Sequence, residues 1–245
     1  MSSNREPQKE LEALEEVRQR RLILDRLDAW IVEEILPYLG QRVLEVGCGH
    51  GNLTRHLLDR ELVVATDVDP ACVELVREKF GHCPNLRTYV HDIASPVTDG
   101  LKALCMDTVV SLNVLEHIKE DLEALRGIAE LLWGGGRAVI VVPAYGWLYG
   151  TMDASIGHYR RYTKRSLAEK LRAAGLQVER LYYLNALGCL GWLVNGRLLH
   201  QTVPPVGFLR WFNLLVPLVA WLERMVRPPF GLSLISVSSR PAAGG

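Results

Sequence analysis

Hydrophobic positions follow two alternating patterns along the middle of the chain. Short apolar runs predict buried strands, and stretches with apolar residues three and four positions apart predict amphipathic helices. Strands that alternate with helices of about 10–15 residues form a parallel sheet covered on both faces, so the pattern predicts a doubly wound α/β fold. The expected strands are residues 42–47, 62–69, 85–93, 106–115, 137–144, 176–184 and 231–239, and the expected helices between them are 52–60, 70–81, 121–133 and 166–175.

The N-terminal segment is expected to be helical as well. Leucine, valine and isoleucine recur at threes and fours from Pro7 to Tyr38, and Pro37 is expected to end the helix. The first half is highly charged, whereas the second half is expected to pack on the domain. We therefore divide the chain into an N-terminal helical segment at 1–40, a core at 41–184 and 231–240, and an apolar helical insertion at 185–230.

The insertion contains two apolar stretches, 186–199 and 208–222. Each is shorter than the roughly 20 residues that a helix needs to span a bilayer, and Pro217 interrupts the second. Such surface must be buried somewhere. A lid over an acceptor pocket, a contact with a partner subunit and a contact with a membrane interface are the three alternatives. The lid is favoured, with Trp192, Phe208, Trp211 and Trp221 as its expected walls.

Overall composition excludes several classes of protein. Hydrophobic residues make up 49% of the chain, and 28 basic residues balance 28 acidic ones. This balance gives no general attraction to nucleic acid or anionic lipid. The five cysteines include no CxxC pair, and the polar N-terminus has no apolar signal core. A cytoplasmic protein is expected, with peripheral membrane contact left open for the insertion.

A glycine-rich turn, GCGHG, follows the first expected strand at Gly47–Gly51. A dinucleotide fingerprint, G-x-G-x-x-G, would need its third glycine at Asn52. Glu45, just before the turn, suits a cationic ammonium better than a pyrophosphate. Asp67 ends the next strand at the spacing of a ribose-binding carboxylate, and Asp92 ends the third, where it could accept from an adenine amino group. The predicted ligand is a nucleoside with an amino-acid tail and no phosphate.

Four motifs together resemble a known family. E-V-G-C-G-x-G, V-A-T-D, V-H-D-I and S-L-N-V-L-E-H occur in this order between residues 42 and 142. As a set they resemble the motifs of class I S-adenosylmethionine-dependent methyltransferases. The resemblance implies a Rossmann-like, mostly parallel seven-stranded sheet with an antiparallel last strand, and S-adenosylmethionine as cofactor.

The resemblance also implies a role for individual residues. Glu45 would lie near the methionine amino group, and Asn113 would contribute to the methionine pocket. Asp69, which precedes Pro70, is expected to cap a helix rather than to bind the cofactor. The implied cofactor-binding set is Glu45, Gly47, Cys48, Gly49, Gly51, Asp67, Val68, Asp92, Ile93 and Asn113.

The acceptor side of the site is expected in two segments after the fourth and fifth strands. His117 and His158 are the candidate bases, because an imidazole titrates near neutral pH. Both readings stay open, since Glu116 and His117 could instead orient their loop and Arg160 and Arg161 could pair with acids. The candidate acceptor contacts are Tyr145, Asp153, Tyr159, Arg160 and Tyr162.

The predicted activity is methyl transfer to a small, partly apolar acceptor, with oxygen as the favoured atom. The acceptor could be a natural product, a carboxylic acid or a lipid- or glycan-linked precursor. A nucleic-acid or protein methyltransferase and a cofactor-binding pseudoenzyme are the alternatives. No metal site is expected, and the absence of an NPPY-like tetrapeptide and of a basic excess argues against nucleic acid as the partner.

Overall fold

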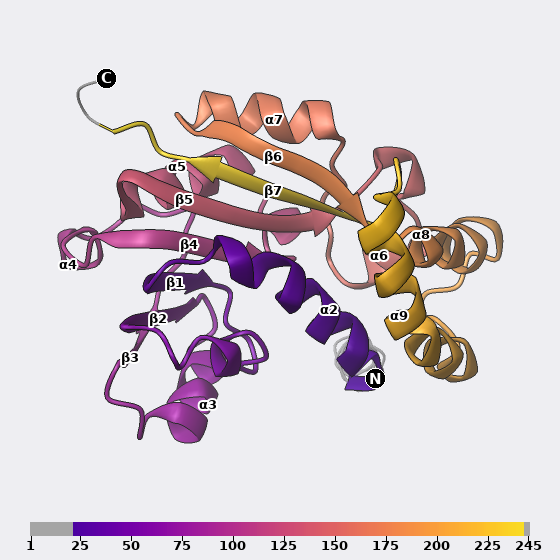
Figure 1. Ribbon diagram of the computed structural model, residues 1–245, viewed down its shortest axis with the longest axis horizontal. Coiled ribbons are helices and arrows are strands. Elements are labelled where there is room, and N and C mark those ends of the chain that lie inside the picture. Colours follow the sequence, from indigo (N-terminus) through magenta and orange to yellow (C-terminus); the bar gives the residue numbers. More distant parts are fainter. Residues whose placement is uncertain (1–21, 243–245) are drawn as a thin grey trace, which may run out of the picture.

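The computed structural model describes residues 22–242, which fold around a seven-stranded sheet with helices on both faces (Figure 1). The strands lie in the order β3-β2-β1-β4-β5-β7-β6. This arrangement confirms the predicted Rossmann-like, doubly wound fold. The strands are β1 Arg42–Val46, β2 Leu62–Asp67, β3 Leu86–Val90, β4 Met106–Leu112, β5 Leu132–Pro143, β6 Gln177–Leu184 and β7 Ser233–Ser239.

The direction of the strands puts most of their carboxyl ends at one edge. Strands β1 to β5 pair in parallel, whereas β7 is antiparallel to both β5 and β6. The expected antiparallel last strand is therefore confirmed. In open sheets of this kind, ligands bind at the carboxyl ends of the parallel strands.

The central strands are apolar on both sides because both faces of the sheet are covered. In β5, Val139, Ile140 and Val141 are fully buried. Val139 and Val141 pack into the cluster that includes Trp30, whereas Ile140 packs into the cluster on the opposite face with Ile128. Alternate side chains of one strand thus supply two separate apolar layers.

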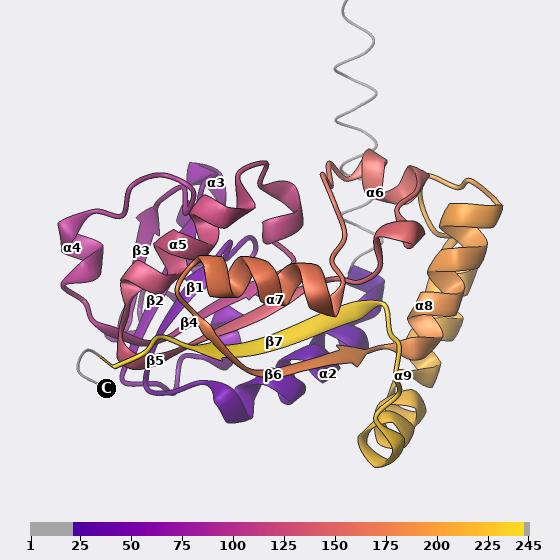
Figure 2. The same ribbon diagram turned by 90° about the horizontal axis from the view of Figure 1, so that it is seen from above.

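The helices form one layer on each face. Figure 2 shows α5 and α7 on one side of the sheet and α2 on the other. Short 3-10 helices complete the connections. The α-helices outside the insertion are α2 Asp25–Ile35, α3 Pro70–Phe80, α4 Asp99–Lys102, α5 Asp121–Leu131, α6 Thr151–Ser155 and α7 Lys164–Ala173, and the 3-10 helices are η1 Leu22–Leu24, η2 Leu36–Tyr38, η3 Thr54–His56, η4 Leu115–His117 and η5 Gly146–Leu148.

The expected helix at 52–60 is much shorter in the structure, where only η3 is helical. The Asn85 side-chain amide donates to the carbonyls of Leu58 and Arg60, at 3.0 and 2.6 Å, and so satisfies backbone carbonyls in the turn that follows η3.

The expected helix at 121–133 is α5, which ends at Leu131, and the glycines that follow it, Gly134, Gly135 and Gly136, lie inside β5. The Arg240 guanidinium donates to the carbonyls of Ala129 and Leu132, at 2.9 and 2.6 Å. An arginine from the chain beyond β7 therefore satisfies carbonyls at the end of α5 that a glycine cap would otherwise serve. The first part of the expected N-terminal helix, up to residue 21, lies outside the described residues.

The insertion folds into α8 Ala186–Trp192, a π-helical turn η6 Leu193–Leu198, and a long helix α9 Val206–Val226. The structure corrects the expected length of the second apolar stretch, because α9 continues through Pro217 for 21 residues. Within the described part of the chain, α9 is the one helix whose length and composition would allow it to cross a membrane.

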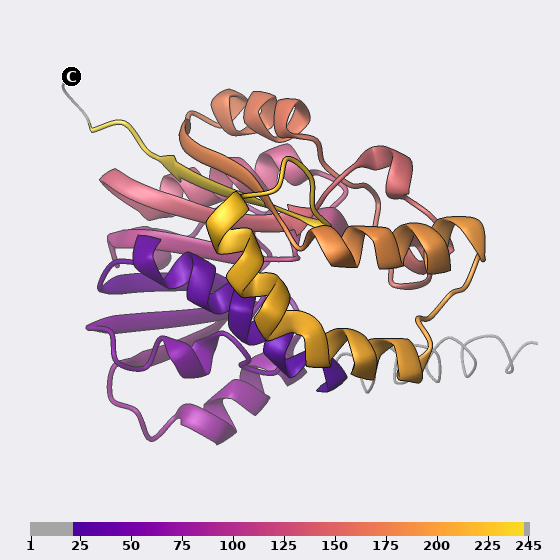
Figure 3. The ribbon, with the colours of Figure 1, turned by 45° about the vertical axis from the view of Figure 1, so that its right-hand side comes forward.

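One face of α9 packs on α2, and the two helices lie side by side (Figure 3). Phe212, Val216 and Ala220 are buried in the same cluster as Trp30 and Val139. This packing supports the helix on both sides of Pro217, which removes a backbone donor without ending the helix.

Polar contacts fix the same helix at both ends. Asn213 donates to Asp25 at 2.7 Å, and Arg224 pairs with Glu33 at 2.7 Å. The buried Glu223 carboxylate accepts hydrogen bonds from the backbone amides of Asn185 and Ala186, at 2.9 and 2.7 Å. Helix α9 is therefore a structural layer of the domain.

Two of the four expected lid residues do not line a pocket. Trp211 and Trp221 point outward from α9 and are more than half exposed. Phe208 lies close to Gly191 of α8, and Trp192 contacts the loop described below. The outward position of Trp211 follows from the helical period, because consecutive residues such as Trp211 and Phe212 lie on different faces of a helix.

The packing of α9 predicts a difference between two neighbouring aromatic residues. Phe212→Ala should lower the free energy of unfolding by about 3 kcal/mol, because it opens a cavity between α9, α2 and the sheet. Trp211→Ala is the matched control and should change it by less than about 0.5 kcal/mol, since the ring is on the surface. Urea denaturation of both variants measures the difference. Equal effects would contradict the packing described here.

Candidate active site

The glycine turn after β1 is held against the end of β2. The amides of Gly47 and Cys48 both donate to the carbonyl of Thr66, at 2.8 and 2.9 Å. Gly47, Gly49 and Gly51 all have positive φ angles, of 75°, 49° and 80°. Only glycine adopts this region at low cost, so the spacing of the three glycines is a requirement of the backbone.

The three glycines differ in what surrounds them. A Cβ atom at Gly47 would lie 2.5 Å from the side chain of Val114, and one at Gly51 would lie 2.7 Å from that of Phe80. A Cβ atom at Gly49 would meet no described atom within 4 Å. The outer two glycines therefore allow close packing, whereas the middle one borders open space at the carboxyl edge of the sheet.

Asp67 ends β2 and faces this turn. Its carboxylate accepts hydrogen bonds from the amides of Gly49 and Asp69, at 2.9 and 3.0 Å. The side chain of Asp69 instead accepts from the amide of Ala71 at 2.9 Å and caps α3. The structure thus brings Asp67 to the glycine turn, and it gives Asp69 the capping position expected for it.

Glu45 is a buried carboxyl group beneath the turn. It accepts a hydrogen bond from the Thr54 hydroxyl at 2.6 Å. Burial raises the pKa of Glu45 from an ordinary 4.5 to about 8, although the bond from Thr54 works against the shift. A buried carboxyl group of this kind is ready to ionise when a cation binds beside it.

The other expected cofactor residues lie around the same edge. Asp92 accepts from the amide of Ala94 at 2.9 Å, and the neighbouring Ile93 is buried. Val68 is exposed and Cys48 is buried. Asn113 follows β4 with a φ of 52°, a strained value for a residue other than glycine that is often found at functional sites.

A buried ionic cluster closes the acceptor side. His158 Nδ1 lies 2.9 Å from Asp153 Oδ1, and the Arg161 guanidinium donates to the same oxygen at 2.7 Å. Burial works to raise the pKa of Asp153, but the bond to His158 and the charge of Arg161 outweigh it and hold that pKa below its ordinary value. An ionised Asp153 only accepts, so His158 Nδ1 carries the proton of this bond, and Nε2 is the second ring nitrogen of the same oriented imidazole.

The insertion reaches this cluster through Trp192. Its indole N–H donates to Asp153 Oδ2 at 3.2 Å, and the guanidinium carbon of Arg161 lies 4.6 Å from the centre of its ring. The end of α8 is therefore fixed to the loop that carries His158. The sequence singled out Trp192 as apolar surface, and neither its pattern nor its spacing indicated the contact with Asp153.

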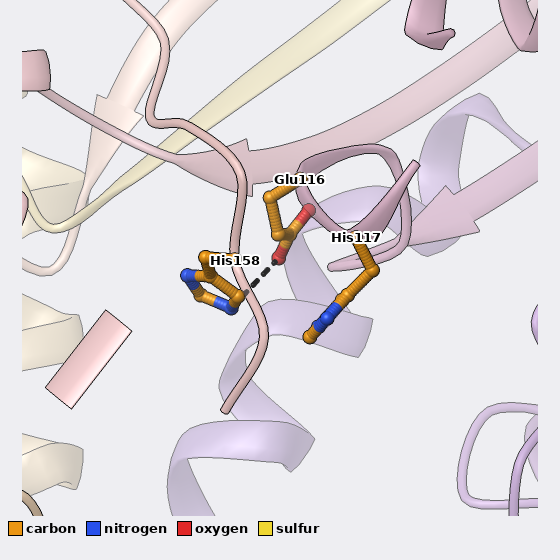
Figure 4. A group of neighbouring side chains, drawn as sticks. All are labelled: Glu116, His117 and His158. Atoms are coloured by element: carbon orange, nitrogen blue, oxygen red, sulfur yellow. Dashed lines mark ion pairs between the residues drawn. The ribbon is translucent and has the colours of Figure 1, made fainter. Parts of the chain in front are cut away.

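The two candidate histidines lie together, at the end of η4 and in the loop before α7. Their ring centres are 4.6 Å apart. Figure 4 shows Glu116 between them, with Oε1 lying 3.8 Å from His158 Nε2. His117 is exposed, whereas the side chain of His158 is 8% exposed. Ligand atoms of Glu116, His117 and His158 lie within 4.8 Å of one another, close enough to hold a metal ion.

Some expected acceptor contacts have structural partners instead. Tyr162 is buried, and its hydroxyl donates to Asp121 at 2.8 Å. Arg160 pairs with Asp121 at 2.8 Å and donates to the carbonyl of Lys119. These contacts hold the loop to α5, which explains why the polar sequence HYRRY does not form an open polar patch.

Two tyrosines of the expected set keep accessible surface. Tyr159 is 58% exposed. Tyr145 has a φ of 63° and stacks on Tyr183 with ring centres 4.9 Å apart. Burial raises the pKa of Tyr145 above its usual range, so its hydroxyl stays protonated at neutral pH. The sequence did not indicate Tyr183 as its partner, because Tyr183 lies on β6, and β7 separates β6 from β5 in the sheet.

Comparison with known proteins agrees with this geometry. A family model described as a methyltransferase domain matches residues 13–181. A ubiquinone biosynthesis O-methyltransferase of Xanthomonas euvesicatoria pv. vesicatoria is 31% identical over 192 residues, covering 71% of this chain and 74% of that protein.

Solved structures share the fold at lower identity. An S-adenosylmethionine-dependent methyltransferase from Mesorhizobium loti superposes with a TM-score of 0.59 at 14% identity, covering 86% of this chain and 96% of that one. The [4+2]-cyclase SpnF superposes with a TM-score of 0.57 at 20% identity, covering 89% and 82%. The fold alone therefore does not determine the chemistry. The family match, the order of the strands and the glycine turn together place this chain among the class I S-adenosylmethionine-dependent methyltransferases.

Proposed function

We propose that this methyltransferase methylates an oxygen atom of a small, partly apolar acceptor. The observation that carries the proposal is the Asp153–His158 pair, which presents an oriented imidazole nitrogen at the carboxyl edge of the sheet. An alcohol or phenol needs such a base, whereas a carboxylate does not. The 31% identity to a ubiquinone biosynthesis O-methyltransferase supports oxygen as the atom methylated.

The chain offers a matching partner for each part of the cofactor. Asp67 would accept from the ribose hydroxyls, and Glu45 would lie near the cationic amino group. Asp92 and Ile93 would receive the adenine, and the open space at Gly49 would admit the methionine portion. When bound, S-adenosylmethionine supplies an electrophilic methyl group on a positively charged sulfur.

The chain itself contributes orientation and a proton acceptor. Holding the acceptor oxygen in line with the methyl carbon supplies most of the acceleration in a displacement of this kind. Asp153 orients His158, so Nε2 would be placed to take the proton that the acceptor oxygen loses on methylation. Arg161 balances the charge of Asp153 in the buried cluster and keeps it ionised.

The alternatives predict different behaviour. A nucleic-acid or protein methyltransferase would need a long binding surface, and the zero net charge of the chain disfavours nucleic acid. A pseudoenzyme would bind S-adenosylhomocysteine and turn over no acceptor. Assay of a panel of phenols, alcohols and carboxylic acids with labelled S-adenosylmethionine separates these possibilities, and turnover of a phenol or alcohol supports the proposal.

Removal of Asp67 tests the cofactor site. Asp67→Ala should weaken S-adenosylhomocysteine binding about 30–1000-fold, the equivalent of roughly 2–4 kcal/mol for two charge-assisted hydrogen bonds. Asp69→Ala is the control, because Asp69 caps α3; it should cost about 1 kcal/mol of stability and leave the affinity unchanged. Calorimetric titration gives both affinities, and an unchanged Kd for Asp67→Ala would remove this residue from the site.

The pKa of Glu45 predicts a proton-linked binding reaction. Folding raises this pKa from 4.5 to about 8. The contribution of the Glu45 carboxyl group to folding stability is therefore fully present below pH 4.5 and is lost as the pH rises through about 8. A bound ammonium group would favour the ionised form. Binding of S-adenosylhomocysteine near pH 7 should then release about one proton. The affinity for this ligand should rise up to about tenfold per pH unit towards pH 8.

Titration in two buffers of different ionisation enthalpy measures this proton release. Glu45→Gln keeps the shape of the side chain but cannot release a proton. The binding enthalpy observed for this variant should therefore be the same in both buffers. Binding by the unaltered protein without proton release would show that the ammonium group lies elsewhere.

Substitution of the histidines tests the base. His158→Gln should lower kcat by about 100-fold or more and leave S-adenosylhomocysteine affinity unchanged. His117→Gln is the comparison, because His117 is exposed, whereas the side chain of His158 is buried and pairs with Asp153. Equal turnover by both variants and the unaltered enzyme would favour an already ionised acceptor, such as a carboxylate. Loss of activity in EDTA, with recovery in Zn²⁺ or Fe²⁺, would instead assign Glu116, His117 and His158 to a metal ion.

A further inference from the structure

The outward face of α9 is an apolar surface without a partner among the described residues. Its members recur at intervals of three and four positions and form a stripe along one side of the helix. The opposite side, with Phe212 and Val216, packs on α2 and the sheet. The outward residues, each at least 45% exposed, are Trp211, Leu214, Leu218, Trp221, Leu222 and Met225.

The first half of the insertion also exposes apolar side chains. Leu190, Val194, Leu198 and Leu199 of α8, η6 and the following turn are each about half exposed or more. Soluble monomers rarely expose an apolar stripe as long as the one along α9, so the stripe marks an interaction site.

Charge distinguishes the possible partners of this surface. From Ala186 to Phe230 the sequence has four arginines, no lysine and a single acidic residue, Glu223. Glu223 is buried and bonded to backbone amides, so the insertion presents no carboxylate to the solvent. Arg197 and Arg210 are exposed beside the apolar residues. The exposed charged side chains of the insertion itself are thus all basic, although the net charge of the chain is zero.

We propose that this face of α9, together with η6, docks onto the surface of an anionic lipid bilayer. Tryptophan favours the boundary between lipid headgroups and acyl chains, and arginine binds anionic headgroups. A helix with an apolar face and basic flanks lies in the plane of that boundary. This inference stands apart from the proposed methylation, because it depends only on the surface of the insertion.

Two other arrangements fit the same surface less well. A membrane-spanning α9 would have to give up the packing of Phe212, the Asn213–Asp25 bond and the Glu223 bonds. A symmetric dimer through this face would bring the arginines of two copies together with no exposed carboxylate of the insertion to balance them. An anionic bilayer offers acyl chains to the apolar stripe and negatively charged headgroups to the arginines beside it.

Docking would also orient the active site. Trp192, at the end of α8, is bonded to Asp153 of α6, which in turn pairs with His158 in the loop that follows α6. The membrane-facing insertion and the acceptor side of the site are thus directly joined. An acceptor with a long apolar tail could reach the site from the bilayer with its tail still in the lipid.

Vesicle sedimentation of the full-length protein tests the proposal. The unaltered protein should sediment with phosphatidylcholine vesicles that contain about 30 mol % phosphatidylglycerol, and at least about tenfold less with phosphatidylcholine alone. The triple variant Trp211→Gln, Leu218→Gln, Trp221→Gln should lose at least about tenfold in vesicle affinity. Trp133→Gln is the matched control, since Trp133 is a similarly exposed tryptophan on β5, and it should bind as the unaltered protein does.

A second pair of variants isolates the charge. Arg197→Gln with Arg210→Gln should weaken binding to the anionic vesicles, whereas Arg87→Gln, at an exposed position in β3, should not. Thermal unfolding and S-adenosylhomocysteine binding, measured on every variant, show that the fold is intact. Failure of the unaltered protein to bind either vesicle, or full binding by the triple variant, overturns the proposal. A change from dimer to monomer in the triple variant, or resistance of the bound protein to carbonate extraction, overturns it in favour of a dimer interface or a membrane span.

Discussion

A parallel sheet must be covered on both faces, and this requirement organises the whole molecule. The central strands bury every side chain, as β5 does from Ala138 to Val142. One face is covered by α5 and α7. On the other, α2 has only 11 residues, and α9 from the insertion completes the layer. The insertion is therefore part of the core, although its sequence interrupts the alternation of strands and helices.

The same constraint concentrates chemistry at the carboxyl edge. Strand interiors are apolar, so polar side chains gather where the strands end. Glu45 is an exception, because this carboxyl group is buried inside a strand. Burial raises its pKa to about 8, so a cation bound beside it can favour ionisation. The Asp153 cluster is buried too, but His158, Arg161 and Trp192 satisfy it. Removing one partner from such a cluster costs more than the pair contributes, because a buried charge is left unpaired.

Helix α9 has one face buried in the protein and one apolar face exposed. Its inner residues meet the requirements of a protein core, and its outer residues remain apolar where a soluble surface would be polar. A helix that is apolar on all sides usually lies inside a large protein or a membrane. Here the position on α2 accounts for only one of the two faces. The other helix of the insertion, α8, is joined to the acceptor side of the site by the bond from Trp192 to Asp153.

The sequence by itself determined the fold class, the glycine turn and the residues at the strand ends. These follow from local rules: hydrophobic period, positive φ at Gly47, Gly49 and Gly51, and the position of Asp67 after a buried run. Tertiary structure alone decided the partners of Asp153, the bonds from Asn85 to the turn after η3, and which face of α9 is buried. Each depends on residues far apart in the chain, such as Trp192 with Asp153 and Asn213 with Asp25. Periodicity shows that a helix has an apolar face, but only the packed chain shows which face the protein covers and which it leaves for another partner.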